Sequence, residues 1–336
     1  MARKTVSHER VDAMLGVSPS WLMRFVKEHP KVRGLTRGIE DARLVGAIDV
    51  HVHADPCSLV VRSQDYTDVA IEAARAGMRA VVRKDHLYST VGEAQAIQRH
   101  IDHLVDSGVL DNRIEVYGGI PTRFAAEPDL IRDAVRFPEF KKIWMNPVGG
   151  IALVEDGRVR PAVVELIEMA RDHGIGLNIG PPNHSAAYGG IDDYEGIAPL
   201  VEAAARIGAT ACLDHPLSSF DVDEIERLTP DGVFAGLFCY PSLPSIIKSP
   251  LSDPAETVEL VRRIGPERCI VASDVGTMLE PSTMASLRLM IRFLLSLGLS
   301  ERDIDLMMKV NPAKLIGLAP PIPMDANPAG SETAAE

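Results

Sequence analysis

Short apolar runs alternate with longer amphipathic stretches from about residue 47 to residue 297. The short runs have the length and the β-branched content of buried strands, whereas the longer stretches repeat their apolar positions at helical spacing. Such alternation is typical of repeated βα units that build a parallel sheet. We predict eight strands, at Ala47–His53, Ala80–Lys84, Ile114–Ile120, Lys142–Asn146, Gly176–Gly180, Ala209–Asp214, Gly232–Phe238 and Cys269–Asp274.

The stretches between these runs predict the helices. They lie at Tyr66–Ala76, Val91–Val105, Leu130–Arg136, Arg160–His173, Tyr194–Ile207, Val222–Arg227, Pro254–Ile264 and Ser282–Leu297. Eight alternations favour an α/β fold of the (β/α)8 TIM-barrel type over an open doubly wound sheet, which usually has fewer strands and a glycine fingerprint after the first. That fingerprint is absent, and we therefore predict one barrel domain over residues 46–318.

The two ends of the chain read differently from the barrel. Residues 1–45 show helical patterning around Val11–Leu15 and Ser20–Lys27, which predicts a helical extension that packs on the barrel or on a neighbouring subunit. After Leu318 the chain continues Ala-Pro-Pro-Ile-Pro and then small polar residues. We expect residues 319–336 to form a short mobile tail.

Composition narrows the classes of partner. The 336 residues are 24% charged and 46% hydrophobic, with a net charge of -12, which argues against binding to a nucleic-acid backbone. The polar start lacks the apolar core of a secretion signal, and the longest apolar stretch, Met290 to Leu299, is too short to span a bilayer. We predict a cytoplasmic protein that acts on a small molecule, without a membrane partner, and that forms a homo-oligomer.

Two histidines stand at the end of the first predicted strand. His51 and His53 are two residues apart, so regular alternation sends both side chains to one face, together with Asp49. In a barrel that end is the C-terminal mouth, where active sites lie. A single histidine there is often a core residue, but two at this spacing favour metal ligation.

Other ligand-type residues recur at predicted strand ends. They are Lys84, Asp85 and His86 after strand two, His184 after strand five, Asp214 and His215 at strand six, and Asp274 at strand eight. With His51 and His53, five of the ten histidines stand at predicted strand ends, whereas the other five fall on predicted helices or at helix ends. The segregation predicts one polar site at the mouth of the barrel.

The order of these residues resembles the metal-binding pattern of the amidohydrolase superfamily. The matching positions are His51-x-His53 on strand one, His184 after strand five, His215 on strand six and Asp274 on strand eight. Asn311-Pro312-Ala313-Lys314-Leu315-Ile316-Gly317-Leu318 is similar to an ending common in that superfamily. The resemblance extends from about Ala47 to Leu318.

Shorter stretches resemble a bacterial branch of metal-dependent hydrolases within that superfamily. These stretches are Lys84-x-His86, Tyr117-Gly118-Gly119-Ile120, Ile143-Trp144-Met145 and Ser273-Asp274-Val275-Gly276. That branch typically reads Gly-His directly after strand five. Here Pro181-Pro182-Asn183 intervene before His184, which weakens the match at that position.

The resemblance implies a mechanism based on a divalent metal. His51, His53 and Asp274 would hold one ion, with zinc expected first and manganese, iron or cobalt as alternatives. His184 and His215 would bind a second ion or orient the substrate. The ion would lower the pKa of a water molecule toward neutrality, and Asp274 would take up the water's proton and pass it to the leaving group.

In relatives with two ions a carboxylated lysine, or another side chain, bridges the pair, usually from strand four. Trp144, Met145 and Asn146 stand at the mouth of strand four, so Lys84 on strand two is the available substitute. His86 beside it would then be a direct ligand. The alternative is that Lys84 pairs with a substrate carboxylate or with Asp55.

Three further residues are candidates for substrate binding. Arg123, after strand three, is placed to bind an anionic group as a bidentate donor, although an ordinary solvated arginine gives the same pattern. Trp144 and Tyr188 would flank an aromatic or cyclic substrate, whereas a buried Trp at a strand end is more often a packing residue. Tyr188 begins a Tyr-Gly-Gly stretch that suits a closing loop.

These residues favour hydrolysis of a C–N bond in an amide, imide or cyclic amide. An ester or a lactone would be attacked in the same way. Non-oxidative decarboxylation of an unsaturated or aromatic acid is a second enzymatic alternative on this scaffold, supported by Arg123 and by the missing strand-four lysine. A barrel that only binds, without catalysis, is the third alternative, and the intact ligand set argues against it.

Overall fold

The computed structural model describes residues 38–122, 128–145, 152–180, 194–243, 252 and 254–321. The helical patterning predicted within residues 1–37 and most of the predicted tail lie outside these ranges. So do three predicted site residues, Arg123, His184 and Tyr188.

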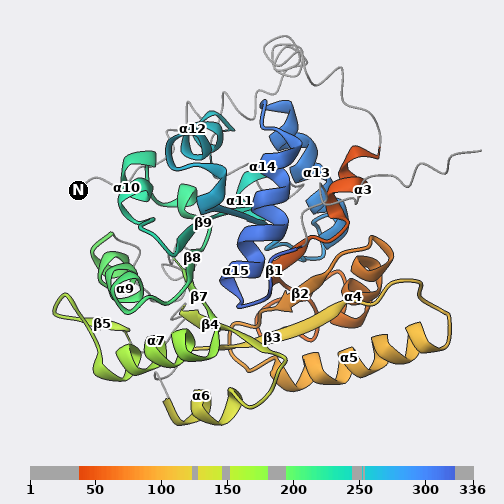
Figure 1. The fold of residues 1–336 in the computed structure, drawn as a ribbon, viewed down its shortest axis with the longest axis horizontal. Coiled ribbons are helices and arrows are strands. Elements are labelled where there is room, and N and C mark those ends of the chain that lie inside the picture. Colours follow the sequence, from red (N-terminus) through yellow and green to blue (C-terminus); the bar gives the residue numbers. More distant parts are fainter. Residues whose placement is uncertain are drawn as a thin grey trace, which may run out of the picture.

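Eight parallel strands form the barrel in sequence order, and each pairs with its neighbour along the chain (Figure 1). Their bounds are β1 Ile48–Val52, β2 Ala80–Arg83, β3 Glu115–Pro121, β4 Phe140–Met145, β7 Gly176–Ile179, β8 Ala211–Leu213, β9 Val233–Phe238 and β10 Cys269–Ala272. The first and last strands meet where the backbone N–H of Asp274 donates to His51 O at 2.9 Å. The predicted (β/α)8 TIM barrel is confirmed.

The helices surround the strands on the outside (Figure 1). Their bounds are α3 Ile39–Leu44, α4 Tyr66–Arg75, α5 Val91–Asp106, α6 Pro128–Ala134, α7 Pro161–His173, α9 Tyr194–Ile207, α10 Val222–Arg227, α11 Cys239–Ser242, α12 Pro254–Ile264, α13 Thr283–Ser296, α14 Glu301–Asp305 and α15 Asn311–Leu315. Side chains of Asp65, Asp221 and Ser282 accept backbone N–H groups at the starts of α4, α10 and α13. The eight predicted helices are present within a few residues of their predicted ends.

Several short elements were not predicted. β5 Val154–Glu155 and β6 Arg158–Val159 form a small antiparallel hairpin, and one π-helical segment, Leu306–Val310, joins α14 to α15. These elements are shorter than the windows in which a hydrophobic period can be recognised. None of the helices in the described ranges combines the length and apolar character needed to cross a bilayer. The cytoplasmic location and the homo-oligomer stay predictions.

The barrel has two apolar layers. The outer layer fills the space between strands and helices, and the inner one fills the barrel itself. The inner cluster comprises Ile48, Val50, Ala80, Val82, Trp144, Cys212, Phe234, Phe238, Ile270, Ala272, Ala313, Leu315 and Ile316. Its last three members come from the end of the chain, so α15 closes the N-terminal end of the barrel. The Nδ2 group of Asn311 holds this helix in place by donating to Pro266 O at 2.8 Å and Cys269 O at 2.7 Å.

The alternation assumed for the first strand is wrong in detail. The register of β1 against β2 shifts between Asp49 and Val52, so that Val50 and His51 both reach the interior. A β-bulge of this kind re-aims the residues that follow it and is common beside active sites. The Asp49 carboxylate instead accepts the backbone N–H groups of His51 at 3.1 Å and of Ser273 at 3.2 Å, which ties β1 to the residue that follows β10.

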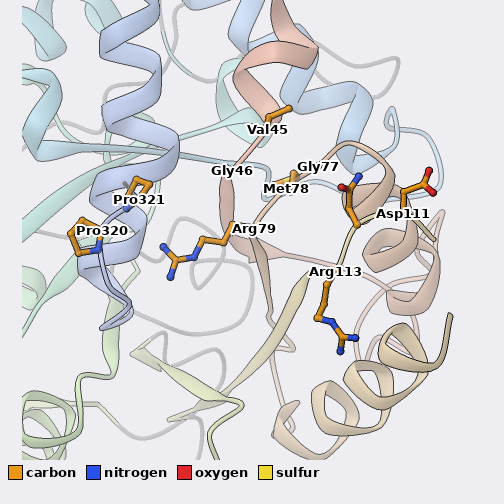
Figure 2. Close-up of a pocket in the computed structure, with 10 residues that line it drawn as sticks. Val45, Gly46, Gly77, Met78, Arg79, Asp111, Arg113, Pro320 and Pro321 are labelled. Carbon is orange, nitrogen blue, oxygen red and sulfur yellow. The ribbon is translucent and has the colours of Figure 1, made fainter. Parts of the chain in front are cut away.

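An open depression of about 600 Å³ lies at the opposite end of the strands from the two histidines (Figure 2). It is lined by residues that precede β1, β2 and β3, among them Gly46, Arg79 and Arg113, together with Pro320. Arg79 is already engaged there, with Glu115 at 3.4 Å and with Ala319 O at 2.6 Å. Because its lining residues stand before the strands begin, the depression is separate from the predicted site at the strands' carboxyl ends.

Candidate metal centre

Three histidines converge on one carboxylate at the mouth of the barrel. The Oδ1 atom of Asp274 lies 3.2 Å from His51 Nε2 and 3.2 Å from His53 Nε2, and its Oδ2 atom lies 3.6 Å from His215 Nε2. The four side chains are buried. They come from the carboxyl ends of β1, β8 and β10, so strands far apart in the sequence bring together four of the predicted metal ligands.

Backbone strain aims two of these side chains. His215 and Asp274 adopt positive φ angles of 33° and 49°, a conformation that costs residues other than glycine about 1–3 kcal/mol. Gly276 nearby has φ 136°, and a Cβ atom there would lie 2.6 Å from His53 O. Strained residues that cluster at one end of a regular barrel indicate a functional site.

Asp214 holds His51 from behind. Its Oδ1 atom lies 3.0 Å from His51 Nδ1, and its Oδ2 atom lies 3.4 Å from Lys84 Nζ. Lys84 thus pairs with Asp214 rather than with Asp55, whose carboxylate accepts the backbone N–H groups of Cys57 and Arg62. An ionised carboxylate at Nδ1 keeps the proton on that atom and leaves Nε2 of His51 as the free lone pair.

His215 is fixed in the same tautomer by a hydroxyl. The Ser218 Oγ group donates its one proton to His215 O at 2.8 Å, and His215 Nδ1 lies 3.0 Å from that Oγ atom. This pair of contacts favours the tautomer with the hydrogen on Nδ1, which then donates to Ser218. The Nε2 atom of His215 is left with a lone pair that faces Asp274.

This arrangement fits a cation. The lone pair of His51 Nε2 faces the carboxylate of Asp274, so one hydrogen-bond acceptor faces another. Both His51 Nε2 and Asp274 Oδ2 are buried without a hydrogen-bond partner. Buried polar atoms normally have partners, and a cation or a proton between these atoms would supply one. The donor set of imidazoles and a carboxylate suits zinc and related divalent ions.

Electrostatics keep the imidazoles ready to ligate. Burial lowers the pKa of His51 to about 3 and that of His53 well below its usual range, so both are neutral at pH 7. Burial and the charge of Asp214 raise the pKa of Asp274 well above its usual range. Burial alone would raise the pKa of Asp214 as well, but the His51 Nδ1–H and the Lys84 ammonium outweigh it and hold that pKa low.

His86 lies beside this cluster. Its ring stacks on that of His53, with centroids 4.8 Å apart and planes 13° apart. The two groups of converging donor atoms found among the described residues, His51–His53–Asp274 and Asp214–His215–Asp274, do not include it. Its loop is held by the neighbouring Asp85, whose carboxylate accepts from Ser58 and from two backbone N–H groups. A ligand role for His86 stays a prediction.

Trp144 forms the floor under His51. The Trp144 ring is fully buried, with its centroid 5.0 Å from that of His51, as expected for a packing residue. A Cβ atom at Gly119 would lie 2.5 Å from Trp144 Nε1, so the glycine makes room for the indole. On the same ring, 4.4 Å from its centroid, lies the ammonium of Lys142.

Sequence reasoning missed Lys142 and Arg62, and it placed Asp214 at the mouth without giving it a role. Lys142 is fully buried below the mouth on β4, where its Nζ donates to Val50 O at 3.0 Å and to Asn178 Oδ1 at 2.9 Å. Lys142 and Trp144 are two residues apart on one strand, so strand alternation could have predicted that both side chains point inward. Asp214 likewise stands two residues after Cys212, whose side chain lies in the barrel interior, and the same alternation predicts an inward side chain. Arg62 lies in a loop, where no period exists.

Comparisons with known proteins add the fold relationship. Residues 46–149 match the model of a family of unknown function, DUF6282. No curated protein matches the chain. A solved structure provisionally named as a 2-pyrone-4,6-dicarboxylic acid hydrolase, from Pseudomonas putida, is similar with a TM-score of 0.54 and 15% identity, and the match covers 81% of this chain and 98% of that one.

Two other solved structures are similar over comparable lengths. A protein from Acinetobacter baumannii with the same provisional name and bound citric acid has a TM-score of 0.53 and 12% identity, covering 82% of this chain and 100% of that one. An amidohydrolase from Burkholderia multivorans with bound zinc has a TM-score of 0.50 and 13% identity, covering 81% and 99%. At these identities the similarity establishes a shared barrel fold.

Proposed function

We propose that this protein is a metal-dependent hydrolase of the amidohydrolase type that cleaves a C–N bond in an amide, imide or cyclic amide. The observation that carries the proposal is the buried meeting of His51 Nε2 with the Asp274 carboxylate, where both His51 Nε2 and Asp274 Oδ2 lack a hydrogen-bond partner. His51, His53, His215 and Asp274 would hold one divalent ion, zinc in the first place. His184 remains a candidate for a second ion.

The residues around the proposed ion would have different roles in the hydrolysis. A divalent ion bound here supplies Lewis acidity and makes water a stronger acid. Asp274 would accept the proton of the attacking water and return it to the leaving nitrogen. Asp214 and Lys84 act through His51 by fixing its tautomer and its ring. Trp144 and the inner apolar cluster around it would keep bulk water away from this network.

Hydrolysis of a lactone or an ester is the second candidate. It requires the same attack by water on an sp2 carbon, with an oxygen leaving group instead of nitrogen. Two of the structurally similar proteins are provisionally named as hydrolases of a 2-pyrone dicarboxylic acid, which is a cyclic ester. A shared barrel and a mouth rich in imidazoles support testing lactones beside amides.

The test is turnover of a panel of cyclic amides, imides and lactones by protein loaded with zinc or manganese, in water enriched in ¹⁸O. We expect one ¹⁸O atom in the acid product and loss of activity after treatment with a chelator. Asp274→Asn should lower turnover by at least 10²-fold, because the amide cannot accept the proton. Release of carbon dioxide without ¹⁸O incorporation would instead support the decarboxylase alternative.

A further inference from the structure

Arg62 is a buried cation that forms no ion pair with a carboxylate of the described residues. It lies between β1 and α4 with 8% of its surface exposed, and its Nη2 atom lies 3.2 Å from His53 Nδ1. Its Nε atom is buried without a hydrogen-bond partner, and within the described ranges no carboxylate forms an ion pair with it. Burying an unpaired guanidinium is costly, so its retention calls for an anion that is brought to it.

The backbone that carries Arg62 is held firmly at the mouth. Its N–H donates to the carboxylate of Asp55 at 3.2 Å, and the residue forms an isolated bridge with Thr277 after β10. The next residue, Ser63, donates its backbone N–H to Gly276 O at 2.9 Å. The side chain is therefore presented from two tied segments, which lowers the entropy lost when it binds a ligand.

In the contact between Arg62 Nη2 and His53 Nδ1, the Nδ1 atom changes from acceptor to donor when His53 binds an ion through Nε2. Without an ion, Nδ1 of His53 can accept from Arg62 Nη2 while Nε2–H donates to Asp274. Ligation through Nε2 requires the proton to sit on Nδ1. Two donors, Nδ1–H and Nη2–H, then face one another and need an acceptor between or beside them.

We propose that Arg62 and the Nδ1 edge of His53 together bind a carboxylate group of the substrate. This inference rests on the proposed function and adds the substrate class, namely carboxylic acids. The nearby ammonium of Lys84 is already paired with Asp214, so Arg62 offers one unpaired positive charge. The single charge of one guanidinium balances a carboxylate monoanion but only half the charge of a phosphate dianion.

The proposed carboxylate site, formed by Arg62 and His53 Nδ1, is distinct from the place where the reacting bond would lie. Arg62 lies on the Nδ1 side of His53, whereas Asp274 lies on the Nε2 side of the same ring. The bound carboxylate is therefore an anchor one imidazole ring away from the reacting bond, and it is not itself the group attacked. Because the ion and the anchor both favour the Nδ1–H tautomer, each should strengthen the binding of the other.

The test is a binding titration that needs no turnover. Benzoate and glutarate, each compared with its amide, are titrated into the wild-type protein, Arg62→Met and Arg62→Lys by ligand-observed NMR, with and without one equivalent of Zn²⁺. We expect Arg62→Met to weaken the acids at least tenfold and the amides less than twofold. Arg62→Lys should fall between, because it keeps the charge and loses the planar fork.

Zinc should strengthen acid binding to the wild type, and acid binding to Arg62→Met by a smaller factor, because only the His53 Nδ1–H then faces the carboxylate. Arg113→Met, at the far end of the barrel, is the matched control and should bind like the wild type. Urea unfolding supplies a second readout: Arg62→Met should be no less stable than the wild type, because no ion pair is lost.

Three outcomes would overturn the inference: equal losses for acids and amides, equal acid affinities of wild type and Arg62→Met, or no preference of the wild type for acids. These outcomes are separable from failure of the proposed function. An enzyme that hydrolyses neutral amides with zinc but shows no Arg62-dependent acid binding keeps the function and loses this inference.

Discussion

The Nδ1 atom of His51 lies 3.0 Å from the Oδ1 atom of Asp214, and both side chains are fully buried. This contact decides the tautomer of His51 and turns its Nε2 lone pair toward Asp274. Metal-binding histidines usually donate their other ring N–H to such a carboxylate, which fixes the ring and raises its basicity. Asp214 is therefore as much a part of the candidate metal centre as the ligands themselves.

Asp214→Asn should weaken metal binding by about 10–100-fold, because the neutral amide loses the charge that holds the His51 proton on Nδ1. Competition with a chromophoric chelator measures this affinity. Asp223→Asn is the matched control, since that carboxylate is on the surface and pairs with Arg263. Equal zinc affinities for the wild type and Asp214→Asn would refute an orienting role for Asp214.

Lys84→Gln should leave the number of bound ions per chain unchanged, because the Lys84 ammonium is turned toward Asp214. It should lower the free energy of unfolding by about 3–5 kcal/mol, the usual cost of breaking a buried ion pair. Elemental analysis and urea unfolding give the two values. Loss of one ion per chain would make Lys84 a ligand after all.

The lowered pKa of Lys142 should make the free energy of unfolding depend on pH. Burial lowers its pKa to about 8 from the ordinary value of 10.5, so between these values the unfolded chain binds a proton that the folded chain has released. The free energy of unfolding from this group therefore rises with pH across that window, by up to about 3 kcal/mol. The difference between wild type and Lys142→Met, followed by urea unfolding from pH 7.5 to 10.5, should show this rise. Lys314→Met on the surface should not, and a flat difference for Lys142→Met would contradict the prediction.

Gly119→Ala should destabilise the barrel by about 1–3 kcal/mol. The new Cβ atom would lie 2.5 Å from both Lys142 O and Trp144 Nε1, which leaves no room under the metal centre. Gly92→Ala is the matched control, because its Cβ meets nothing within 4 Å inside helix α5, and it should stabilise the protein by about 0.5–1 kcal/mol. Thermal unfolding compares the two, and equal stability of Gly119→Ala and wild type would remove Trp144 as a tightly packed floor.

The barrel was predictable from sequence because its signals are local and repeated. Each strand is a short apolar run between amphipathic helices, and the eight repeats leave few alternative folds. The convergence of His51, His53, His215 and Asp274 followed from one further rule, that strand ends of a barrel share a mouth. The bulge in β1 did not follow, because it depends on the pairing of two strands rather than on the residues of one.

The supporting residues were harder to predict for a physical reason. Asp214 and Lys142 act through contacts with strands far along the chain, and the partner of each is decided only when the barrel closes. Lys84 was recognised as an important residue, but its partner is Asp214 and not Asp55. Arg62 gave no signal, because a single arginine in a loop reads as a solvated residue until its burial is known.

The most direct test of the metal centre is anomalous diffraction from crystals of the protein grown with zinc, recorded on both sides of the zinc absorption edge. We predict an anomalous peak within bonding distance of His51 Nε2, His53 Nε2 and the Asp274 carboxylate, with His215 Nε2 turned toward it. Zinc-saturated crystals with no peak among these four side chains would contradict the central claim.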